Sequence, residues 1–584
     1  MAATSIKSLL HQAALVTPDQ FEAWRREWLA EPDSDTKAKS LLGHLQRRTE
    51  LPEPVFLSRL SAALGWPYLE RVTLPQDDEA KRELRRRLSP KVAFSHQVTP
   101  VKIEDNRVWL ATANPFNADL VNAVLFDLGE RAQFALAPQD EVDKGLKGIY
   151  GVGAETLDGM AKDDTGDEEQ AASKDITAED QEASVIKFVN QIIWEAYNSR
   201  ATDIHFEPME TDLRIRYRID GMLYRAPVPN ELKKYQSAIL SRIKVMAGMN
   251  IAEKRLPQDG RINVRIKGQE IDIRVSTVPT VYGESTSLRL LRRGGQIWTM
   301  PSLGLPPREE EAIQQLIRKP HGIFLVTGPT GSGKSTSLYT FLTEINVPTK
   351  RIITVEEPVE YEIAGINQIA VRPEIGLTFA VGLRHILRQD PNVVMVGEIR
   401  DLETAEIAIR AALTGHLVFS TLHTNDAPSA FTRLIDMGIE PFLVASSVEA
   451  VMAQRLVRLI CPQCRAPQAV EPQYLLKIGF PRERIETARF FKGAGCDECR
   501  FLGYQGRTGI YELLVVTESM RPLIMNRAPA STIAGHAIAD GMKTLRMAGW
   551  ERVCHPEKPT TIEEVLRVTQ VEEHLAALLG DEKN

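Results

Sequence analysis

The chain has 584 residues, in which 71 lysines and arginines stand against 78 aspartates and glutamates, for a net charge of −7. Hydrophobic residues make up 43% and charged residues 26%, the proportions of an ordinary globular protein. These values exclude a collagen, a fully disordered protein and a small disulfide scaffold, and the length suggests about three to four domains. The mildly acidic balance argues against a dedicated nucleic-acid binder but is compatible with a local basic groove.

Neither a signal peptide nor a membrane-spanning helix is expected. Residues 1–12 contain no long apolar core, and the most apolar stretch, residues 442–453, is interrupted by Ser446, Ser447 and Glu449. Four of the five cysteines form two Cys-x-x-Cys pairs, which suits a metal site in a reducing compartment better than a disulfide framework. We therefore expect a soluble cytoplasmic protein that could still dock on a membrane protein.

Residues 1–50 are expected to form a helical extension. Phe21, Trp24 and Trp28 stand at helical spacing, which favours a stripe facing the core over a surface that docks a partner. Residues 31–36 predict a turn that interrupts the helices. The role of this extension stays open.

Residues 51–150 are expected to form an α/β domain, followed by a linker. The pattern predicts a strand at 108–112 and a helix at 118–126. Residues 155–182 hold eleven acidic residues, two lysines and no aromatic residue, so this segment cannot bury enough surface to order itself. We predict a flexible acidic linker over 151–182, with an acidic docking tail as the alternative.

Residues 183–305 predict an open sheet that packs on one side. In the segments 213–219, 261–267 and 271–276, apolar residues alternate with polar ones, so each strand has one apolar face. The opposite face is rich in arginine. It is either a solvated surface or a surface that meets the phosphates of a nucleotide or a nucleic acid.

Residues 306–584 begin with short aliphatic runs that alternate with helical patterns. These runs lie at 323–326, 352–355, 393–396 and 417–420. Because they are continuous rather than alternating, they predict strands buried on both faces, as in a parallel α/β sheet.

A phosphate-binding loop follows the first of these strands. The sequence Gly328-Pro-Thr-Gly-Ser-Gly-Lys-Ser335 fits the pattern G-x-x-x-x-G-K-[ST] and precedes a helix predicted from Ser335 onward. Its backbone N–H groups and the helix N-terminus suit phosphate oxygens. Lys334 would reach the β- and γ-phosphates, and Ser335 would ligate Mg²⁺. The predicted nucleotide-binding residues are Gly328, Pro329, Thr330, Gly331, Ser332, Gly333, Lys334, Ser335 and Thr336.

Acidic residues and a histidine follow three further strands. Glu398 follows the aliphatic run at 393–396. Glu356 and Glu357 follow the run at 352–355. The carboxyl ends of parallel strands meet at one edge of a sheet, so these carboxylates could hold Mg²⁺ or orient the attacking water. His423 follows the next strand, where it is either structural or a sensor of the γ-phosphate.

Cys461, Cys464, Cys496 and Cys499 predict a structural zinc site, because two Cys-x-x-Cys turns supply four thiolates and leave no open position. Thirty-one residues separate the two pairs, and much of this excursion is too polar to build a core alone. The metal is therefore expected to supply much of the folding free energy of the segment. Cys554 stands alone and reads as a small buried apolar residue.

Together these motifs resemble the secretion ATPase family, the motors of type II secretion and type IV pilus assembly. The similarity covers residues 185–515 and includes the Walker A loop, the Walker B strand ending in Glu398 and the His box around His423. The segments 254–260 and 383–391 are further hallmarks. One departure is Glu356-Glu357-Pro358, where the family usually has Glu-Asp-Pro. It leaves open which carboxylate orients the water.

The resemblance implies an α/β fold with a RecA-like P-loop core that carries a small zinc subdomain at about 461–500 and a helical C-terminal part. A PAS-like lobe over 183–305 and a docking domain over 51–150 complete the chain. The resemblance also implies a hexamer in which arginines meet the nucleotide phosphates; the matching positions are Arg274, Arg289, Arg384 and Arg388. Retraction motors generally lack the long N-terminal domain and the four cysteines, so the chain resembles the assembly or secretion branch.

The expected function is that of a Mg²⁺-dependent ATPase that drives assembly of a type IV pilus or a type II secretion pseudopilus. The resemblance implies a cytoplasmic location, docked on platform proteins of the inner membrane. A nucleotide-gated scaffold and a nucleic-acid translocase of the conjugation branch are the alternatives, although nucleic acid is disfavoured by the charge. Whether the N-terminal domain binds a cyclic dinucleotide stays open, because the expected Arg-Leu-Gly-type repeat is not visible.

Overall fold

The computed structural model describes residues 6–30, 40–75, 77–117, 132–151, 178–266, 268–292 and 298–570, together with residues 120, 121, 123, 124, 128 and 154. The chain divides into two compact units, residues 1–291 and 292–584. The division lies earlier than the expected boundary at 305/306, because Met300, Leu303 and Leu305 pack into the core of the second unit. No helix among the described residues is long and apolar enough to cross a membrane.

The first unit begins with four helices that share one core. They are α1 (Ile6–Gln12), α2 (Pro18–Ala30), α3 (Leu41–Arg48) and α4 (Glu53–Leu64). Phe21 is buried in this core and Trp24 packs against it, so the aromatic stripe faces inward as expected. Because Leu136 from the following domain belongs to the same core, the helical extension is not a separate body. The predicted turn at 31–36 lies outside the described residues.

An α/β domain follows the four helices. Its sheet joins β1 (Val98–Glu104), β2 (Arg107–Thr112) and β3 (Ala132–Leu136), with β1 antiparallel and β3 parallel to the central strand. The helices are α5 (Asp78–Arg87), α6 (Pro90–Ser95) and α8 (Gln139–Tyr150). Strand β2 confirms the prediction at 108–112. The helix predicted at 118–126 lies largely outside the described residues.

The predicted linker also lies mostly outside the described residues, at 155–177. Its last five residues belong instead to helix α10 (Ala178–Asn198), so the linker is shorter than predicted. The helix can begin this early because an apolar stripe starts at Val185 and continues through Phe188 and Ile192, all of which are buried.

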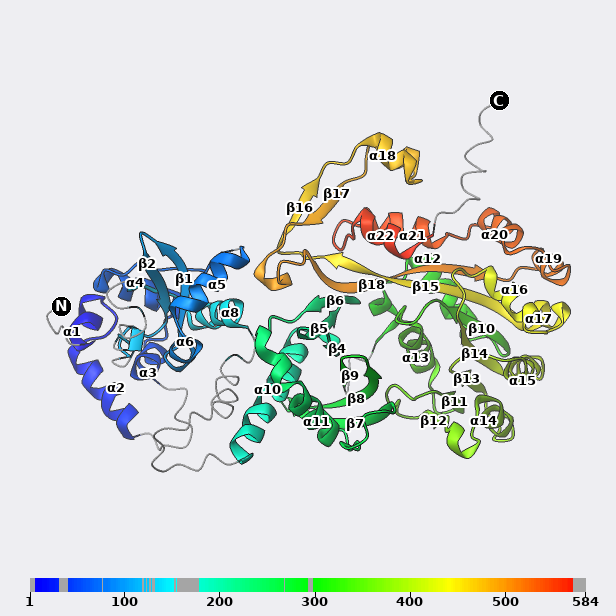
Figure 1. Cartoon of the computed structure of the whole chain (residues 1–584). Helices are drawn as coiled ribbons and strands as arrows, with labels where there is room; N and C mark the ends of the chain where they lie inside the picture. The colour runs from blue at the N-terminus through cyan, green and yellow to red at the C-terminus, as the bar shows by residue number, and fades with distance from the viewer. Residues whose placement is uncertain are drawn as a thin grey trace. The chain divides into compact units, whose positions relative to one another are not determined.

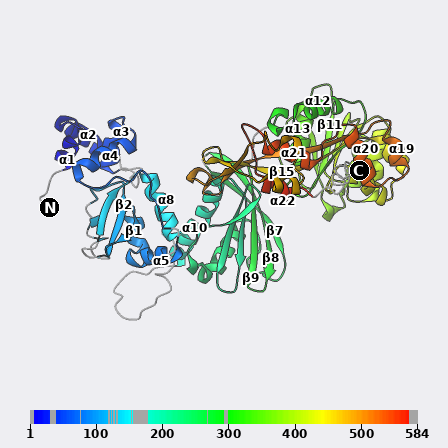
Figure 2. The ribbon, with the colours of Figure 1, turned by 90° about the horizontal axis from the view of Figure 1, so that it is seen from above.

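The lobe that follows is a six-stranded sheet with helices on one face (Figure 2). The strand order is β6-β5-β4-β9-β8-β7, from β4 (Ala201–Pro208), β5 (Leu213–Ile219), β6 (Met222–Arg225), β7 (Gln258–Ile266), β8 (Gln269–Thr280) and β9 (Gly283–Arg292). Ile215 and Ile273 face α10 and α11 (Gln236–Met246) in one core. The three alternating strands expected from the sequence are confirmed as β5, β7 and β8.

The second unit is built on a seven-stranded sheet of order β12-β11-β13-β14-β10-β15-β18 (Figure 1). Its strands are β10 (Gly322–Thr327), β11 (Ile352–Glu356), β12 (Asn367–Ala370), β13 (Val393–Val396), β14 (Leu417–Leu422), β15 (Val448–Ile460) and β18 (Tyr504–Val515). All neighbours pair in parallel except β15 and β18. The four strands predicted from aliphatic runs are confirmed and fully buried.

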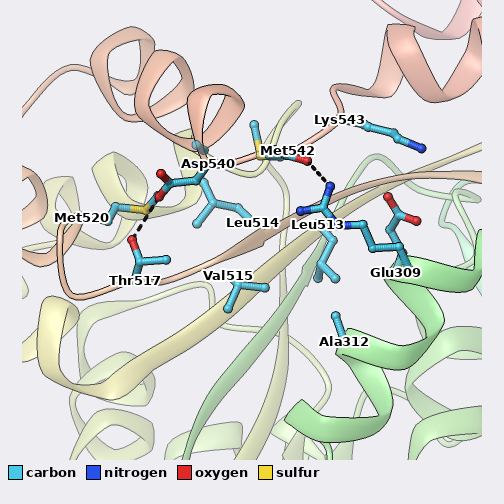
Figure 3. Close-up of a pocket in the computed structure, with 13 residues that line it drawn as sticks. Glu309, Ala312, Leu513, Leu514, Val515, Thr517, Met520, Asp540, Met542 and Lys543 are labelled. Carbon is cyan, nitrogen blue, oxygen red and sulfur yellow. Dashed lines mark hydrogen bonds between the residues drawn. The ribbon is translucent and has the colours of Figure 1, made fainter.

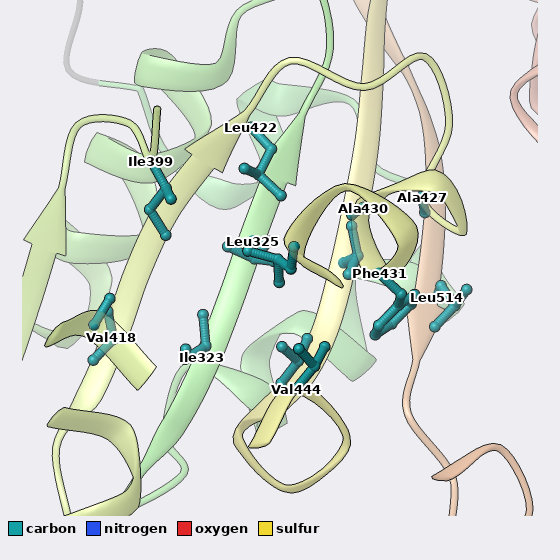
Figure 4. Close-up of a cluster of buried hydrophobic side chains, with 14 of the residues drawn as sticks. Ile323, Leu325, Ile399, Val418, Leu422, Ala427, Ala430, Phe431, Val444 and Leu514 are labelled. Carbon is teal, nitrogen blue, oxygen red and sulfur yellow. The ribbon is translucent and has the colours of Figure 1, made fainter. Parts of the chain in front are cut away.

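Helices cover both faces of this sheet, which explains why its strands are apolar on both sides. On one face, Phe431 of α16 and Val444 of α17 pack on Leu325, Val418 and their neighbours (Figure 4). On the other, α12 and α13 form a second core. The helices are α12 (Pro307–Leu316), α13 (Lys334–Ile345), α14 (Phe379–Ile386), α15 (Leu402–Leu413), α16 (Ser429–Asp436), α17 (Pro441–Ser447), α19 (Arg521–Met525), α20 (Ala530–Ala539), α21 (Leu545–Val553) and α22 (Ile562–Val568).

The excursion that carries the cysteines leaves the sheet between β15 and β18. It contains the hairpin of β16 (Arg465–Gln468) and β17 (Phe490–Gly493) and helix α18 (Pro472–Lys477). Phe480 stacks edge-on against Phe490 and Trp550, with ring centroids 5.4 and 5.6 Å away. The excursion therefore shares an apolar core with α21 and α22, which the sequence prediction of a metal-dependent segment did not include.

Candidate nucleotide site

The phosphate-binding loop lies between β10 and α13, as the sequence predicts. The glycines at 328, 331 and 333 have φ values of 148°, 79° and 91°, a region that side chains rarely adopt. Space is also short, because a Cβ on Gly333 would stand 2.7 Å from Nε2 of Gln454. The loop can therefore bring its backbone close to an anion at the N-terminus of α13.

Lys334 is the first residue of α13 and turns back over the loop. Its ammonium group donates hydrogen bonds to the carbonyl oxygens of Gly328, at 2.7 Å, and Pro329, at 3.2 Å. Burial lowers the pKa of Lys334 to about 8, although the charge of Glu398 acts in the opposite direction. A half-buried ammonium group whose hydrogen bonds go to carbonyl oxygens is well suited to take up a phosphate oxygen.

The carboxyl ends of β11, β13 and β14 meet beside this loop in a cavity of about 130 Å³. Its lining includes the predicted residues Lys334, Ser335, Glu356, Glu357, Glu398 and His423. The structure thus brings together the loop and all the acidic and histidine candidates, on the ligand-binding edge of a parallel sheet.

Glu398 is held from both sides. Its Oε1 is 2.5 Å from Arg400, and its Oε2 is 3.2 Å from Nε2 of His423. Arg400 also contacts Glu357, at 2.9 Å. The sequence prediction did not include Arg400, although it stands only two residues after the Walker B glutamate. One guanidinium therefore contacts both Glu357 and Glu398.

Glu356 and Glu357 have different surroundings. Glu356 is buried and accepts hydrogen bonds from Tyr339, Thr354 and Gln368. Burial raises the pKa of Glu356 despite these donors. Glu357 keeps 33% of its side chain exposed and has Arg400 as its partner. Both carboxylates line the cavity, but Glu357 is the more exposed of the two.

Arg384 and Arg388, which belong to the same unit as this cavity, are not among the residues that line it. Both are exposed, on α14 and just beyond it, and Arg384 pairs with Glu403 of α15. Arg274 and Arg289 belong to the sheet of the first unit. There, Nε of Arg289 donates to Oδ1 of Asp203 at 3.0 Å.

The arginine-rich face of that sheet also carries acidic residues. Arg216 of β5 contacts Glu207 of β4 at 2.5 Å, beside the pair formed by Asp203 and Arg289. The predicted arginine-rich face is present, and β4, which the sequence pattern did not reveal, supplies carboxylates to it. The face thus carries ion pairs between neighbouring strands and is not a uniformly positive surface.

The four cysteine sulfurs converge within 4.8 Å of one another. The separations are 3.8 Å for Cys461–Cys496 and 3.7 Å for Cys464–Cys499. Four thiolates at a Zn–S distance of about 2.3 Å have tetrahedral S–S edges of about 3.8 Å, so this donor set fits zinc. Cys554 lies outside this cluster; it is partly buried and packs against the apolar core around Trp550.

A second cavity of about 130 Å³ shares no residue with the phosphate-binding loop. In Figure 3, Thr517 points at Asp540 on one side of this cavity, and Glu309 of α12 lies on the other. Arg308 donates to the carbonyl oxygen of Gly541 at 2.9 Å. These contacts fasten the start of α12 to the turn between α20 and α21.

The comparison with known proteins agrees with this geometry. The model of the family described as Type II/IV secretion system protein matches residues 178–567. The chain belongs to this family. A model of the MshEN domain matches residues 64–156. The resemblance stated from the motifs is thereby confirmed.

Relatives of two kinds match. The type II secretion system protein E of Aeromonas hydrophila is 50% identical over 403 residues, which cover 69% of this chain and 79% of that protein. The type IV pilus assembly ATPase PilB of Myxococcus xanthus is 40% identical over 499 residues, covering 84% of this chain and 87% of that protein. The crystal structure of the pilus retraction motor PilT with ADP is 26% identical and covers 66% of this chain and 98% of its own, at a TM-score of 0.44.

The predicted fold class is confirmed. The chain has a RecA-like P-loop core, a second α/β lobe and an additional N-terminal α/β domain. The cysteine cluster is present, whereas zinc in it stays a prediction.

Proposed function

We propose that this chain is a Mg²⁺-dependent ATPase that powers assembly of a type IV pilus or a type II secretion pseudopilus. The observation that carries the proposal is the convergence of Lys334, Ser335, Glu357 and Glu398 in one cavity at the carboxyl edge of the sheet. Both kinds of relative support it, since one is named a type II secretion protein and the other a pilus assembly ATPase.

Each residue of the cavity has a role that its chemistry suits. The loop N–H groups and Lys334 bind the phosphates, where fixed positive charge stabilises the transferring phosphoryl group. The Ser335 hydroxyl and the Glu398 carboxylate are hard oxygen ligands of the kind that Mg²⁺ prefers; the ion would neutralise phosphate charge. Glu357 orients the attacking water. His423, which contacts Glu398, senses the γ-phosphate.

The arginines complete the proposed site. Arg274 and Arg289 act from the N-terminal lobe, and Arg384 and Arg388 from the RecA-like core, in a ring of six identical chains. Arginine suits this role because its planar fork binds phosphate oxygens in pairs and keeps its charge. Because Arg274 and Arg289 belong to one unit and the phosphate-binding loop to the other, motion of lobes or contact between neighbouring chains would gate hydrolysis.

The remaining assignments follow from the family and the donor sets. We place the motor in the cytoplasm, docked through residues 51–150 on platform proteins of the inner membrane. One Zn²⁺ per chain is held by Cys461, Cys464, Cys496 and Cys499, whose sulfurs lie within 4.8 Å of one another.

The test compares three variants of the full chain. Lys334→Ala should lose nucleotide binding, Glu398→Gln should bind ATP without hydrolysing it, and Glu406→Gln should behave as the wild type. Glu406 is the matched control, because it is an exposed carboxylate on α15 that pairs with Arg410, outside the cavity. Hydrolysis by Glu398→Gln at the wild-type rate would refute the assignment.

The same assay separates the alternatives. A nucleotide-gated scaffold would show no ATP turnover under any condition. A nucleic-acid translocase would be stimulated by DNA, whereas the motor proposed here should respond to the cytoplasmic domain of its platform protein.

A further inference from the structure

A cavity of about 490 Å³ lies between the cysteine-bearing excursion and the end of α21. Arg465, Arg484 and Arg489 line it, together with Thr487, Ala488, Phe491, Cys554 and Pro556. No carboxylate belongs to this lining, and no lining residue belongs to the cavity beside the phosphate-binding loop. Three positive charges thus converge on one hollow without an acidic residue in its wall.

Arg465 is fixed in position. It donates to the carbonyl oxygens of Pro556, at 3.0 Å, and Glu557, at 3.3 Å, and its guanidinium lies 4.8 Å from the centre of the Phe491 ring. Among the described residues, its guanidinium contacts carbonyl oxygens and an aromatic ring but no carboxylate. The pair therefore forms a wall that is cationic and aromatic at once.

The other two arginines keep most of their binding capacity. Arg484 reaches Glu551 only at 3.9 Å, and that carboxylate already accepts a hydrogen bond from Lys543 at 3.1 Å. Within the described parts of the chain, Arg489 has no hydrogen-bond or ion-pair partner. Two guanidinium forks are thus available to an anion that enters the cavity.

We propose that this cavity binds a phosphorylated anion with at least two negative charges. Arg484 and Arg489 take the phosphate oxygens, and the Arg465–Phe491 wall takes an apolar or planar part of the ligand. Guanidinium groups match phosphate geometry in pairs, and a volume of 490 Å³ exceeds the needs of a single inorganic phosphate. A soluble polyphosphate compound and the headgroup of an anionic phospholipid share this chemistry.

Cys554 supplies a local reporter, because its thiol lies in the wall of this cavity. The experiment follows the alkylation of Cys554 in the zinc-loaded full chain by peptide mass spectrometry, with pyrophosphate as the probe. Only ligand-free protein reacts, so labelling should slow by a factor of 1 + [L]/Kd, about tenfold at a concentration about ten times Kd. Vesicles of phosphatidylglycerol, against phosphatidylcholine, form the second arm and identify a lipid headgroup.

Variants make the test specific. Arg489→Ala and Arg484→Ala should each lose most of the protection, whereas Arg482→Ala should keep it, because Arg482 is exposed on the same excursion but does not line the cavity. Protection should persist in Lys334→Ala, which separates this site from the phosphate-binding loop and from the proposed ATPase activity. Absence of protection by both probes would overturn the proposal, as would equal protection in the Arg484 and Arg489 variants.

Discussion

His423 and Glu398 meet at the ends of β14 and β13, with 3.2 Å between Nε2 of the histidine and Oε2 of the glutamate. The same glutamate contacts Arg400, which also contacts Glu357. Four side chains thus form one row across the carboxyl edge of the sheet. Any cation that binds Glu398 must compete with Arg400. Because Arg400 also contacts Glu357, a change in the affinity for Mg²⁺ at Glu398 should be linked to the position of Glu357.

The first prediction concerns this competition. In Arg400→Ala, the Mg²⁺ concentration that half-saturates hydrolysis should fall by a few-fold, because an exposed ion pair is worth at most about 1 kcal/mol. The maximal rate should also fall, since Glu357 loses the partner that holds it. Arg410→Ala is the control, because it removes an exposed arginine of α15 whose acidic partner is Glu406, a residue that does not line the cavity. An unchanged Mg²⁺ dependence in Arg400→Ala would contradict the bridging role.

The second prediction separates two adjacent glutamates. Glu357→Gln should lower the turnover number by about a hundredfold, as expected for loss of a base that orients water, with little change in the midpoint of thermal unfolding. Glu356→Ala should instead destabilise the fold by about 2 kcal/mol, because it leaves the buried hydroxyl groups of Tyr339 and Thr354 without their acceptor.

Turnover and thermal unfolding of both variants check this. If Glu356→Gln, which keeps an acceptor and the size of the side chain, abolishes turnover without affecting stability, then the two assignments are reversed.

This pair also shows what the sequence could predict. Glu356 is the last residue of β11 and Glu357 follows it directly, so the pattern places both at the ligand edge. Their roles are decided by the direction of each side chain and by Tyr339 on α13, a partner seventeen positions away. No pattern within one strand contains that information.

The strands show a similar limit. Aliphatic runs reveal β10, β11, β13 and β14, which are buried along their whole length. Strand β15 is missed by the same criterion because Gln454, Arg455 and Arg458 interrupt it. Those polar residues find specific partners, such as Glu564 of α22 at 2.6 Å from Arg458. Long-range pairing of this kind satisfies polar groups inside a sheet but leaves no local trace in the sequence.

The third prediction follows from the lowered pKa of Lys334, about 8 against 10.5 for a free lysine. The pKa of Lys334 is higher in the unfolded chain than in the folded one, so burying its charge lowers the free energy of unfolding at pH values below about 8. This destabilisation is relieved as the pH rises from about 8 to 10.5. Bound phosphates should raise the pKa again. Nucleotide binding just above pH 8 should therefore take up a proton, and affinity should weaken as the pH rises further.

Isothermal titration calorimetry in two buffers of different ionisation enthalpy measures this uptake. Lys334→Arg is the control, since arginine keeps its charge across the range and should show no linked proton. Identical heats in both buffers for the wild type would contradict the prediction.

The fourth prediction concerns Asp203, which holds Arg289 through Nε and so leaves both terminal nitrogens of the guanidinium for phosphate oxygens. Arg289→Ala should lower the turnover number on the order of a thousandfold, the scale for loss of a charge-stabilising arginine. Asp203→Ala should lower it less, with a smaller change in KM, because the arginine remains but is no longer aligned. Adding Asp203→Ala to Arg289→Ala should have little further effect on turnover.

Glu207→Ala removes the partner of Arg216 on the same face and is the matched control. If it lowers turnover as much as Asp203→Ala does, then the effect belongs to the stability of the lobe and not to the alignment of Arg289.

The last prediction revises the expected dependence of the excursion on its metal. Trp550 of α21 packs on Phe480 and donates from its indole nitrogen to the carbonyl oxygen of Gly479 at 3.1 Å. The outer part of the excursion therefore has its own anchor on the helical C-terminal part, while the cysteines hold its base. Chelation or Cys496→Ser should expose the chain near the cysteines to protease and leave the region around Phe480 protected. Trp550→Ala should do the opposite, at a cost of about 3 to 5 kcal/mol for a large buried aromatic side chain. Only the two changes together should release the whole excursion, while nucleotide binding at the phosphate-binding loop largely survives.

Limited proteolysis with mass spectrometry maps the cleavage sites, and elemental analysis gives the zinc content. Loss of protection over the whole excursion on chelation alone would show that the metal dominates, and a purified protein without stoichiometric zinc would refute the metal assignment.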